Sequence, residues 1–194
     1  MRIPRSSVLE YPQRHAVSAP EYLRMGEAGV FGPEARLELI EGEIIEMTPI
    51  GSPHAGAVKM LTRLLVRMAG DRAVVSVQDP VVLGDRSVPQ PDLALLEPRA
   101  DGYSAAHPTA AEILLAIEVA DTTLAFDLGT KVPLYARAAV PEVWVIDVNE
   151  QAIRVYRDPS ASGYKTSFTV TGQNSVASVA LPDVRVVVSN LFPQ

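Results

Sequence analysis

Apolar side chains follow two kinds of pattern along this chain, and together they predict both helices and strands. Between residues 52 and 69 they recur every three or four positions, at Val58, Leu61, Leu65 and Met68, as on one face of a helix. Elsewhere, short uninterrupted apolar runs fit strands that are buried on both faces; they lie within 93–96, 113–117 and 142–148. The pattern predicts an α/β (α+β) fold around a buried sheet, with Trp144 in its core.

Turn signals predict further elements at both ends of the chain. Ser18 ahead of Pro20 predicts a short helix over 20–28, and Glu41-Gly42 between two apolar runs predicts a hairpin over 36–47. A strand is expected over 74–83, with an interruption at Asp79-Pro80. Three more strands are expected in the tail, over 153–157, 164–170 and 184–188.

Two capping residues predict where the longer helices begin. Ser52 is expected to cap the helix that ends near residue 69, with Pro53 in its first turn. A second helix is expected over 131–138, because Pro133 fits only the first turn of a regular helix and Thr130 can cap it. Lys131 would then stand at the helix entrance and contribute little to packing.

Composition predicts one domain in a reducing compartment. The 194 residues are 47% hydrophobic and 21% charged, which is enough for one core. We expect residues 1–17 to form a flexible arm and residues 18–194 to form a single domain. No apolar run approaches the roughly 20 residues that span a bilayer, and the first residues lack the apolar segment of a signal peptide. The absence of cysteine excludes disulfides and thiolate metal sites, so we expect a cytoplasmic protein without a membrane anchor.

The net charge of −6 argues against broad, unspecific affinity for nucleic acid. It does not exclude a nuclease, because metal sites are themselves acidic. Lys59, Arg63 and Arg67 follow one another at intervals of four on the long helix, which predicts either a face that contacts nucleic acid or a solvated outer face. The aromatic content of 6% provides little material for the stacking of single-stranded bases or sugars.

Three charged residues at the ends of apolar runs suggest a metal site. Asp92 opens one run and Glu118 closes another, and a carboxylate in such a position needs a cation or hydrogen-bond donors. Two carboxylates on adjacent strands can hold Mg²⁺ or Mn²⁺, and the backbone carbonyl of Val119 is a further oxygen ligand. Lys131 could offset the charge that develops on a phosphate. The alternative is structural: Asp92 in a turn, Glu118 paired with an arginine, and Lys131 solvated.

A series of short motifs, in order along the chain, resembles the Uma-two family of restriction-endonuclease-like proteins in the PD-(D/E)XK nuclease superfamily. The motifs are ELIEGE from Glu38, SPH from Ser52, PDLALL from Pro91, IEVADTT from Ile117, Asp127-x-x-x-Lys131 with Tyr135, and VPEVWVID from Val140. The resemblance implies a restriction-endonuclease-like mixed β-sheet flanked by helices, with an additional N-terminal hairpin and C-terminal strands. It also implies metal-dependent hydrolysis of phosphodiester bonds at one edge of the sheet.

The resemblance also assigns residues to that site. Asp92 and Glu118 match the two acidic ligands, and Lys131 matches a lysine displaced onto the following helix, since Ala120 stands where the simplest superfamily motif has lysine. Glu38 would be an additional acidic group or a packed hairpin glutamate paired with arginine. His54 would contact substrate or cap local structure, and Tyr135 would pack beside Lys131 or belong to the core. Asp127 is expected to be a polar loop residue.

Two functions from different classes remain open. One is a Mg²⁺-dependent DNA endonuclease that acts on double-stranded DNA as a homodimer, with apolar residues such as those at 186–188 as interface material. The other is a catalytically weak nuclease-fold protein that serves as a DNA-associated or protein-interaction module. A glycoside hydrolase with two carboxylates fits poorly, because aromatic residues are scarce.

Overall fold

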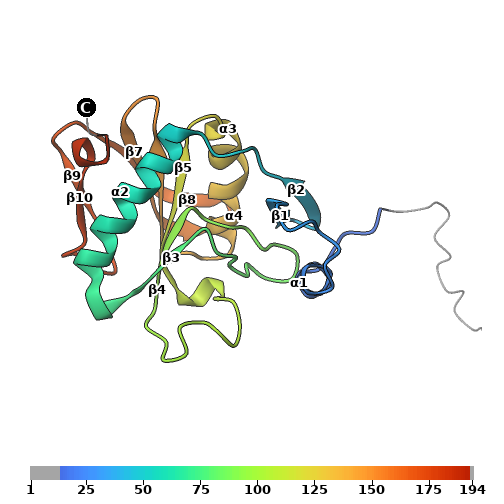
Figure 1. Ribbon diagram of the computed structural model, residues 1–194. Helices are drawn as coiled ribbons and strands as arrows, with labels where there is room; N and C mark the ends of the chain where they lie inside the picture. The colour runs from blue at the N-terminus through green and yellow to red at the C-terminus, as the bar shows by residue number, and fades with distance from the viewer. Residues whose placement is uncertain (1–13, 193–194) are drawn as a thin grey trace, which may run out of the picture.

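A six-stranded mixed sheet lies at the centre of the computed structural model, which describes residues 14–192 (Figure 1). Its strand order is β3-β4-β5-β6-β7-β8. Only β5 and β6 run parallel, while every other neighbouring pair is antiparallel. The strands are β3 (Val74–Val77), β4 (Leu93–Leu96), β5 (Ile113–Ala120), β6 (Glu142–Asp147), β7 (Ala152–Ser160) and β8 (Gly163–Thr171). The predicted mixed sheet is confirmed, although the strand expected over 74–83 ends at Val77.

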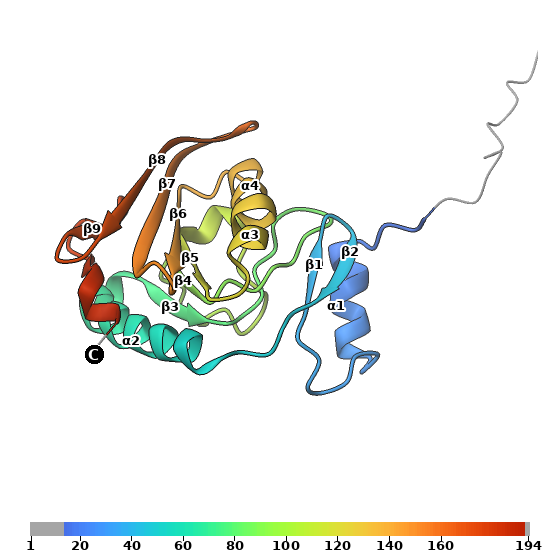
Figure 2. The same ribbon diagram turned by 90° about the horizontal axis from the view of Figure 1, so that it is seen from above.

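Helix α2 (Ser52–Ala69) covers one face of this sheet, and the helices between β5 and β6 cover the other (Figure 2). The apolar stripe of α2 buries Leu61 and Leu65 against the central strands, as the periodicity predicts. Its cap differs from the expectation: Gly51 occupies the cap position in an extended conformation, and Ser52 is already helical. None of the helices within residues 14–192 is long and apolar enough to cross a membrane.

The helical connection from β5 to β6 begins earlier than expected. It consists of α3 (Leu124–Phe126), a π-helical turn (Asp127–Lys131) and α4 (Val132–Arg137), so the prediction that the helix begins at Lys131 with Thr130 as its cap is wrong. In the π turn the Val132 N–H bonds to the Asp127 carbonyl, one residue further back than in an α-helix. This wider turn directly precedes Pro133, whose ring would clash in the interior of a regular α-helix. Lys131 therefore lies within the helical segment and not at its entrance.

An N-terminal lobe packs beside the sheet (Figure 2) and consists of α1 (Ala19–Glu27) and the hairpin of β1 (Leu37–Ile40) with β2 (Glu43–Glu46). Ser18 and Glu21 form the capping box of α1. The expected arm lies outside the described residues as far as residue 13. The rest of it is held, because the Val17 N–H donates to the Gly42 carbonyl at 2.9 Å.

The C-terminal segment confirms the three predicted tail strands and adds one. Beyond β7 and β8, β9 (Ser175–Ala177) pairs with β10 (Arg185–Val187), and this pair packs on the α2 side of the sheet. Val186 and Val188 are buried in that core, so the expectation that these residues form a dimer interface is wrong. Trp144 is fully buried, as predicted.

Gly42 is expected to be essential for the close contact between residues 16–17 and the hairpin of the N-terminal lobe. Its φ is +87°, and a Cβ at this position would lie 2.9 Å from the Cβ of Ala16. Gly42→Ala should lower the free energy of unfolding by about 1–3 kcal/mol in urea titrations. Gly56→Ala is the matched control, because that position is helical with open space around it, and it should stabilise the protein by about 0.5–1 kcal/mol. Equal effects of the two substitutions would contradict this account.

Candidate active site

The site forms at the N-terminal end of β4, which lies between β3, of equal length, and the longer β5. Leu93 pairs with Val77 of β3 on one side and with Ile117 of β5 on the other. One step beyond, the same registers bring Asp92 opposite Gln78 and opposite Glu118. Directly opposed residues of antiparallel strands have Cβ atoms about 4.5–5.5 Å apart. The register therefore brings the two predicted carboxylates side by side at the end of β4, within the sheet.

The side chain of Asp92 accepts hydrogen bonds that a longer β4 would otherwise make with its backbone. The Val119 N–H donates to its Oδ2 at 2.8 Å, and the Gln78 side-chain amide donates to its Oδ1 at 3.1 Å. His54, from the first turn of α2, places Nε2 3.0 Å from the same Oδ2. Burial would raise the pKa of Asp92, but the contact with His54 and the two amide donors hold it below its usual value.

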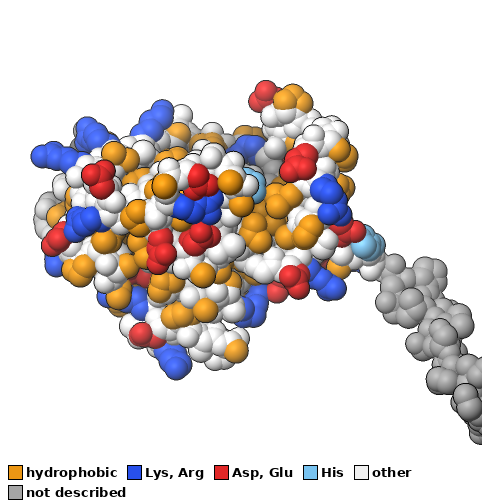
Figure 3. Space-filling view, turned by 90° about the horizontal axis from the view of Figure 1, so that it is seen from below, with side chains coloured by type: hydrophobic (Ala, Val, Ile, Leu, Met, Phe, Trp, Pro, Cys, Tyr) orange, Lys and Arg blue, Asp and Glu red, His pale blue; other side chains and the backbone are white. Residues whose placement is uncertain are grey.

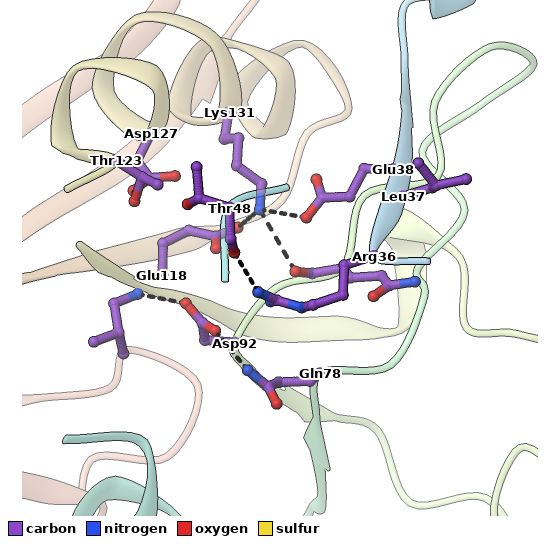
Figure 4. Close-up of polar contacts among 12 residues, drawn as sticks. Arg36, Leu37, Glu38, Thr48, Gln78, Asp92, Glu118, Thr123, Asp127 and Lys131 are labelled. Atoms are coloured by element: carbon purple, nitrogen blue, oxygen red, sulfur yellow. Dashed lines mark hydrogen bonds and ion pairs between the residues drawn. The ribbon is translucent and has the colours of Figure 1, made fainter. Parts of the chain in front are cut away.

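Glu118 is held by the crossover helix (Figure 4). Lys131 Nζ lies 2.9 Å from Glu118 Oε1, and the Tyr135 hydroxyl donates to the same oxygen at 2.6 Å. Lys131 Nζ also reaches Glu38 Oε1 at 3.1 Å and the Gln90 carbonyl at 3.5 Å. An ammonium has three donors, so these three acceptors use all of them.

Lys131 is consequently a buried residue and not a solvated one. It is 1% exposed, and Glu38 beside it is 3% exposed. Burial would lower the pKa of Lys131, but the adjacent carboxylates of Glu118, Glu38 and Asp127 raise it, so the ammonium stays charged. The expected arginine partners of Glu118 and Glu38 are replaced by this lysine.

The π turn presents a third residue to the same place. Asp127, Lys131 and Tyr135 follow one another at intervals of four and are all buried, so the expectation that Asp127 is a loop residue is wrong. Thr123 donates to Asp127 Oδ2 at 2.7 Å. Burial raises the pKa of Asp127 to about 6.

Burial likewise raises the pKa of Glu118 well above its usual value; Lys131 opposes this rise, while the nearby carboxylates of Asp127, Asp92 and Glu38 add to it. The cavity thus holds more carboxylates than its own cations neutralise.

A cavity of about 140 Å³ connects these groups to solvent. The hairpin, the segment 47–51 that joins it to α2, the ends of β4 and β5 and the crossover helix all contribute to its wall. Its charged or titratable lining residues are Arg36, Glu38, His54, Asp92, Glu118, Asp121, Asp127 and Lys131.

Lys59, Arg63 and Arg67 do not line this cavity. They are exposed on α2, whose first turn carries His54 into the site. The face shown in Figure 3 has basic side chains gathered at one corner, with acidic and basic ones interspersed elsewhere. A solvated face and a nucleic-acid contact both remain compatible with this position.

The donor chemistry of the cavity fits a hard divalent cation. Asp92 and Glu118 offer carboxylate oxygens, and Glu38 Oε2 is buried without a hydrogen-bond partner among the described residues. Val119 directs its N–H, and therefore its carbonyl, toward the side on which β4 has ended. Within residues 14–192 no three His, Asp or Glu side chains converge on one point as a ready set of ligands. Mg²⁺ needs only one or two carboxylates and retains several waters, so the residues present are sufficient.

Three polar residues of the site were missed from the sequence. Arg36 precedes the hairpin strand, Gln78 follows β3 with a φ of +57°, and Gln90 supplies only its carbonyl. Gln78 directly precedes the expected interruption at Asp79-Pro80, and its positive φ has no signature in a glutamine. Asp127 did have a signal, because it lies one helical turn before Lys131.

The mixed six-stranded sheet with helices on both faces is a restriction-endonuclease-like fold. The family profile Uma2, described as "Putative restriction endonuclease", matches residues 19–189, so the chain belongs to this family. The comparison with curated proteins finds no match. Among solved structures, a "putative nuclease belonging to DUF820" from Anabaena variabilis is 17% identical, with a TM-score of 0.68, over 91% of this chain and 97% of that one. The predicted family and fold are confirmed.

Lys131→Met should destabilise the protein strongly, whereas replacement of a solvated lysine in a first helical turn would have little effect on stability. The substitution leaves Glu118 and Glu38 buried without their counter-charge, and breaking a buried ion pair in this way costs about 3–5 kcal/mol. The free energy of unfolding in urea measures this effect. Lys165→Met, at an exposed position, is the control and should change it by no more than about 0.5 kcal/mol. A loss below about 1 kcal/mol in Lys131→Met would show that the ion pairs are unimportant for stability.

Proposed function

We propose that this protein is a DNA endonuclease that depends on Mg²⁺ or Mn²⁺ and hydrolyses phosphodiester bonds. The observation that carries the proposal is the juxtaposition of Asp92 and Glu118 in one cavity with Lys131 behind them. Membership of the Uma2 family supports the reaction class.

Hydrolysis joins a water oxygen to phosphorus and breaks the bond from phosphorus to one sugar oxygen. Asp92, Glu118 and the Val119 carbonyl would hold the cation, which supplies charge at a phosphoryl oxygen and lowers the pKa of a bound water. Lys131 favours the ionised form of Glu118 and offsets negative charge as it develops on the phosphate. Tyr135 and Glu38 fix the positions of Glu118 and Lys131 through their hydrogen bonds.

The proposed substrate is double-stranded DNA in the cytoplasm. Lys59, Arg63 and Arg67 are exposed, and α2 rises about 6 Å over each interval of four residues, so they form a track of positive charge that leads away from the cavity. Cutting both strands of a duplex favours two sites related by a two-fold axis, and we therefore propose a homodimer.

One observation favours the alternative, a catalytically weak nuclease-fold protein that acts as a DNA-associated or protein-interaction module. Both carboxylates already have partners: Asp92 contacts His54, and Glu118 contacts Lys131. A cation must compete with these contacts or add to them through the remaining lone pairs.

Asp92→Asn tests the metal site. In the wild type, a divalent cation at 100 times its dissociation constant should raise the free energy of unfolding by about 2.7 kcal/mol, and it should support cleavage of plasmid DNA. The variant should lose both effects, because an amide oxygen carries no charge for the cation. Asp183→Asn removes an exposed carboxylate far from the cavity and should behave like the wild type. Cleavage by Asp92→Asn at the wild-type rate would refute the assignment. A wild type that binds DNA but never cuts it would favour the alternative.

The track on α2 predicts a salt dependence. Replacing Lys59, Arg63 and Arg67 together by alanine should weaken binding of duplex DNA of any sequence. If each contacts one phosphate, the slope of log K against log salt should fall in magnitude by about 2.7, which is three times about 0.9. Fluorescence anisotropy over a salt series measures this slope. An unchanged slope would mean that these residues form an ordinary solvated face.

A further inference from the structure

Among the described residues, two side chains of fixed positive charge line the cavity, Lys131 and Arg36, and their N–H donors have different partners. Lys131 directs its three donors to Glu118, Glu38 and the Gln90 carbonyl. It cannot contact a substrate without giving up one of these partners. Its charge acts on the cavity from behind the carboxylates.

Arg36, in contrast, uses few of its N–H donors among residues 14–192. One guanidinium nitrogen donates to the Thr48 carbonyl, and this is its only side-chain hydrogen bond within the described part of the chain. It forms no salt bridge there, although Glu38, Asp92 and Glu118 line the same cavity. Figure 4 shows its guanidinium pointing into the space bounded by Thr48, Glu118 and Asp92. A guanidinium has five N–H donors, so four stay available.

We propose that Arg36 is the residue that binds the phosphate next to the scissile bond. Its planar fork suits two oxygens of one phosphate, and this charge-assisted geometry is stronger than a contact between neutral groups. The carboxylates in this cavity repel a phosphate unless a cationic side chain with free N–H donors can bind it. Among the described lining residues, Arg36 is such a side chain. This inference rests on the proposed function, since it names the group that receives the substrate of that site.

The alternative is that Arg36 only stabilises the fold. Its bond to Thr48 ties β1 to the segment that leads into α2, and the fold could require nothing more. Arg36→Gln separates the two roles, because glutamine retains a donor for the Thr48 carbonyl but has neither the charge nor the fork. Arg36→Lys retains the charge and loses only the fork.

The experiment measures binding of a short DNA duplex in EDTA and in Ca²⁺, together with cleavage in Mg²⁺. Arg36→Ala and Arg36→Gln should both lower kcat/KM by about 10²-fold or more, and each should reduce the salt slope of binding by about 0.9. Arg36→Lys should retain the slope and recover part of the rate. Arg185→Ala, which removes an exposed arginine from β10, should match the wild type.

Two failures are distinguishable. If the wild type and Arg36→Gln cut and bind equally well, Arg36 is structural and the inference is overturned, while the endonuclease remains. If the wild type neither cuts nor binds duplex DNA, the proposed function itself fails. Thermal unfolding of each variant shows whether a loss comes from misfolding; Arg36→Gln, which can still bond to Thr48, should retain the melting temperature of the wild type.

Discussion

The buried ammonium of Lys131 is the constraint on which the rest of the site depends. Removal of one charged group from water is costly unless its donors and its charge are both matched, and here Glu118, Glu38 and the Gln90 carbonyl match them. These three acceptors come from the central sheet, from the hairpin lobe and from the segment that precedes β4. The ion pairs therefore join the lobe to the sheet and the crossover helix at one point, and the cavity wall is assembled around that point.

Because β4 begins only at Leu93, space for the cavity remains beside β5. A strand that continued past Leu93 would pair with β5 beyond Ile117 and use the backbone groups of Val119. Instead the side chain of Asp92 accepts the Val119 N–H, and the sheet gains a polar edge between β3 and β5. The hydrogen bond that completes the sheet also orients a proposed metal ligand. Stability and the proposed function thus share the same carboxylate.

The π turn helps to place Lys131 next to Glu118. Lys131 lies thirteen residues after Glu118 in sequence, beyond the end of the strand, and must return to it. The parallel pairing of β5 with β6 requires a helical crossover, and this crossover packs over the face of the sheet to which Glu118 points. The wider turn aligns Asp127, Lys131 and Tyr135 on that face and allows Pro133 to follow. Lys131 thus reaches Glu118 from the helix that follows β5.

The sequence alone determined the elements whose signal is local. Apolar periodicity gave α2, uninterrupted apolar runs gave the central strands, and Glu41-Gly42 gave the hairpin, because backbone preference and burial pattern act over a few residues. Ordered motifs identified Asp92, Glu118 and Lys131 as candidates. Only the tertiary structure decided that Lys131 is buried, that Asp127 faces the cavity and that Arg36 retains free donors. Those properties depend on which distant segments meet at the end of β4, and charge pairing across 93 residues, as between Glu38 and Lys131, leaves no pattern in the chain itself.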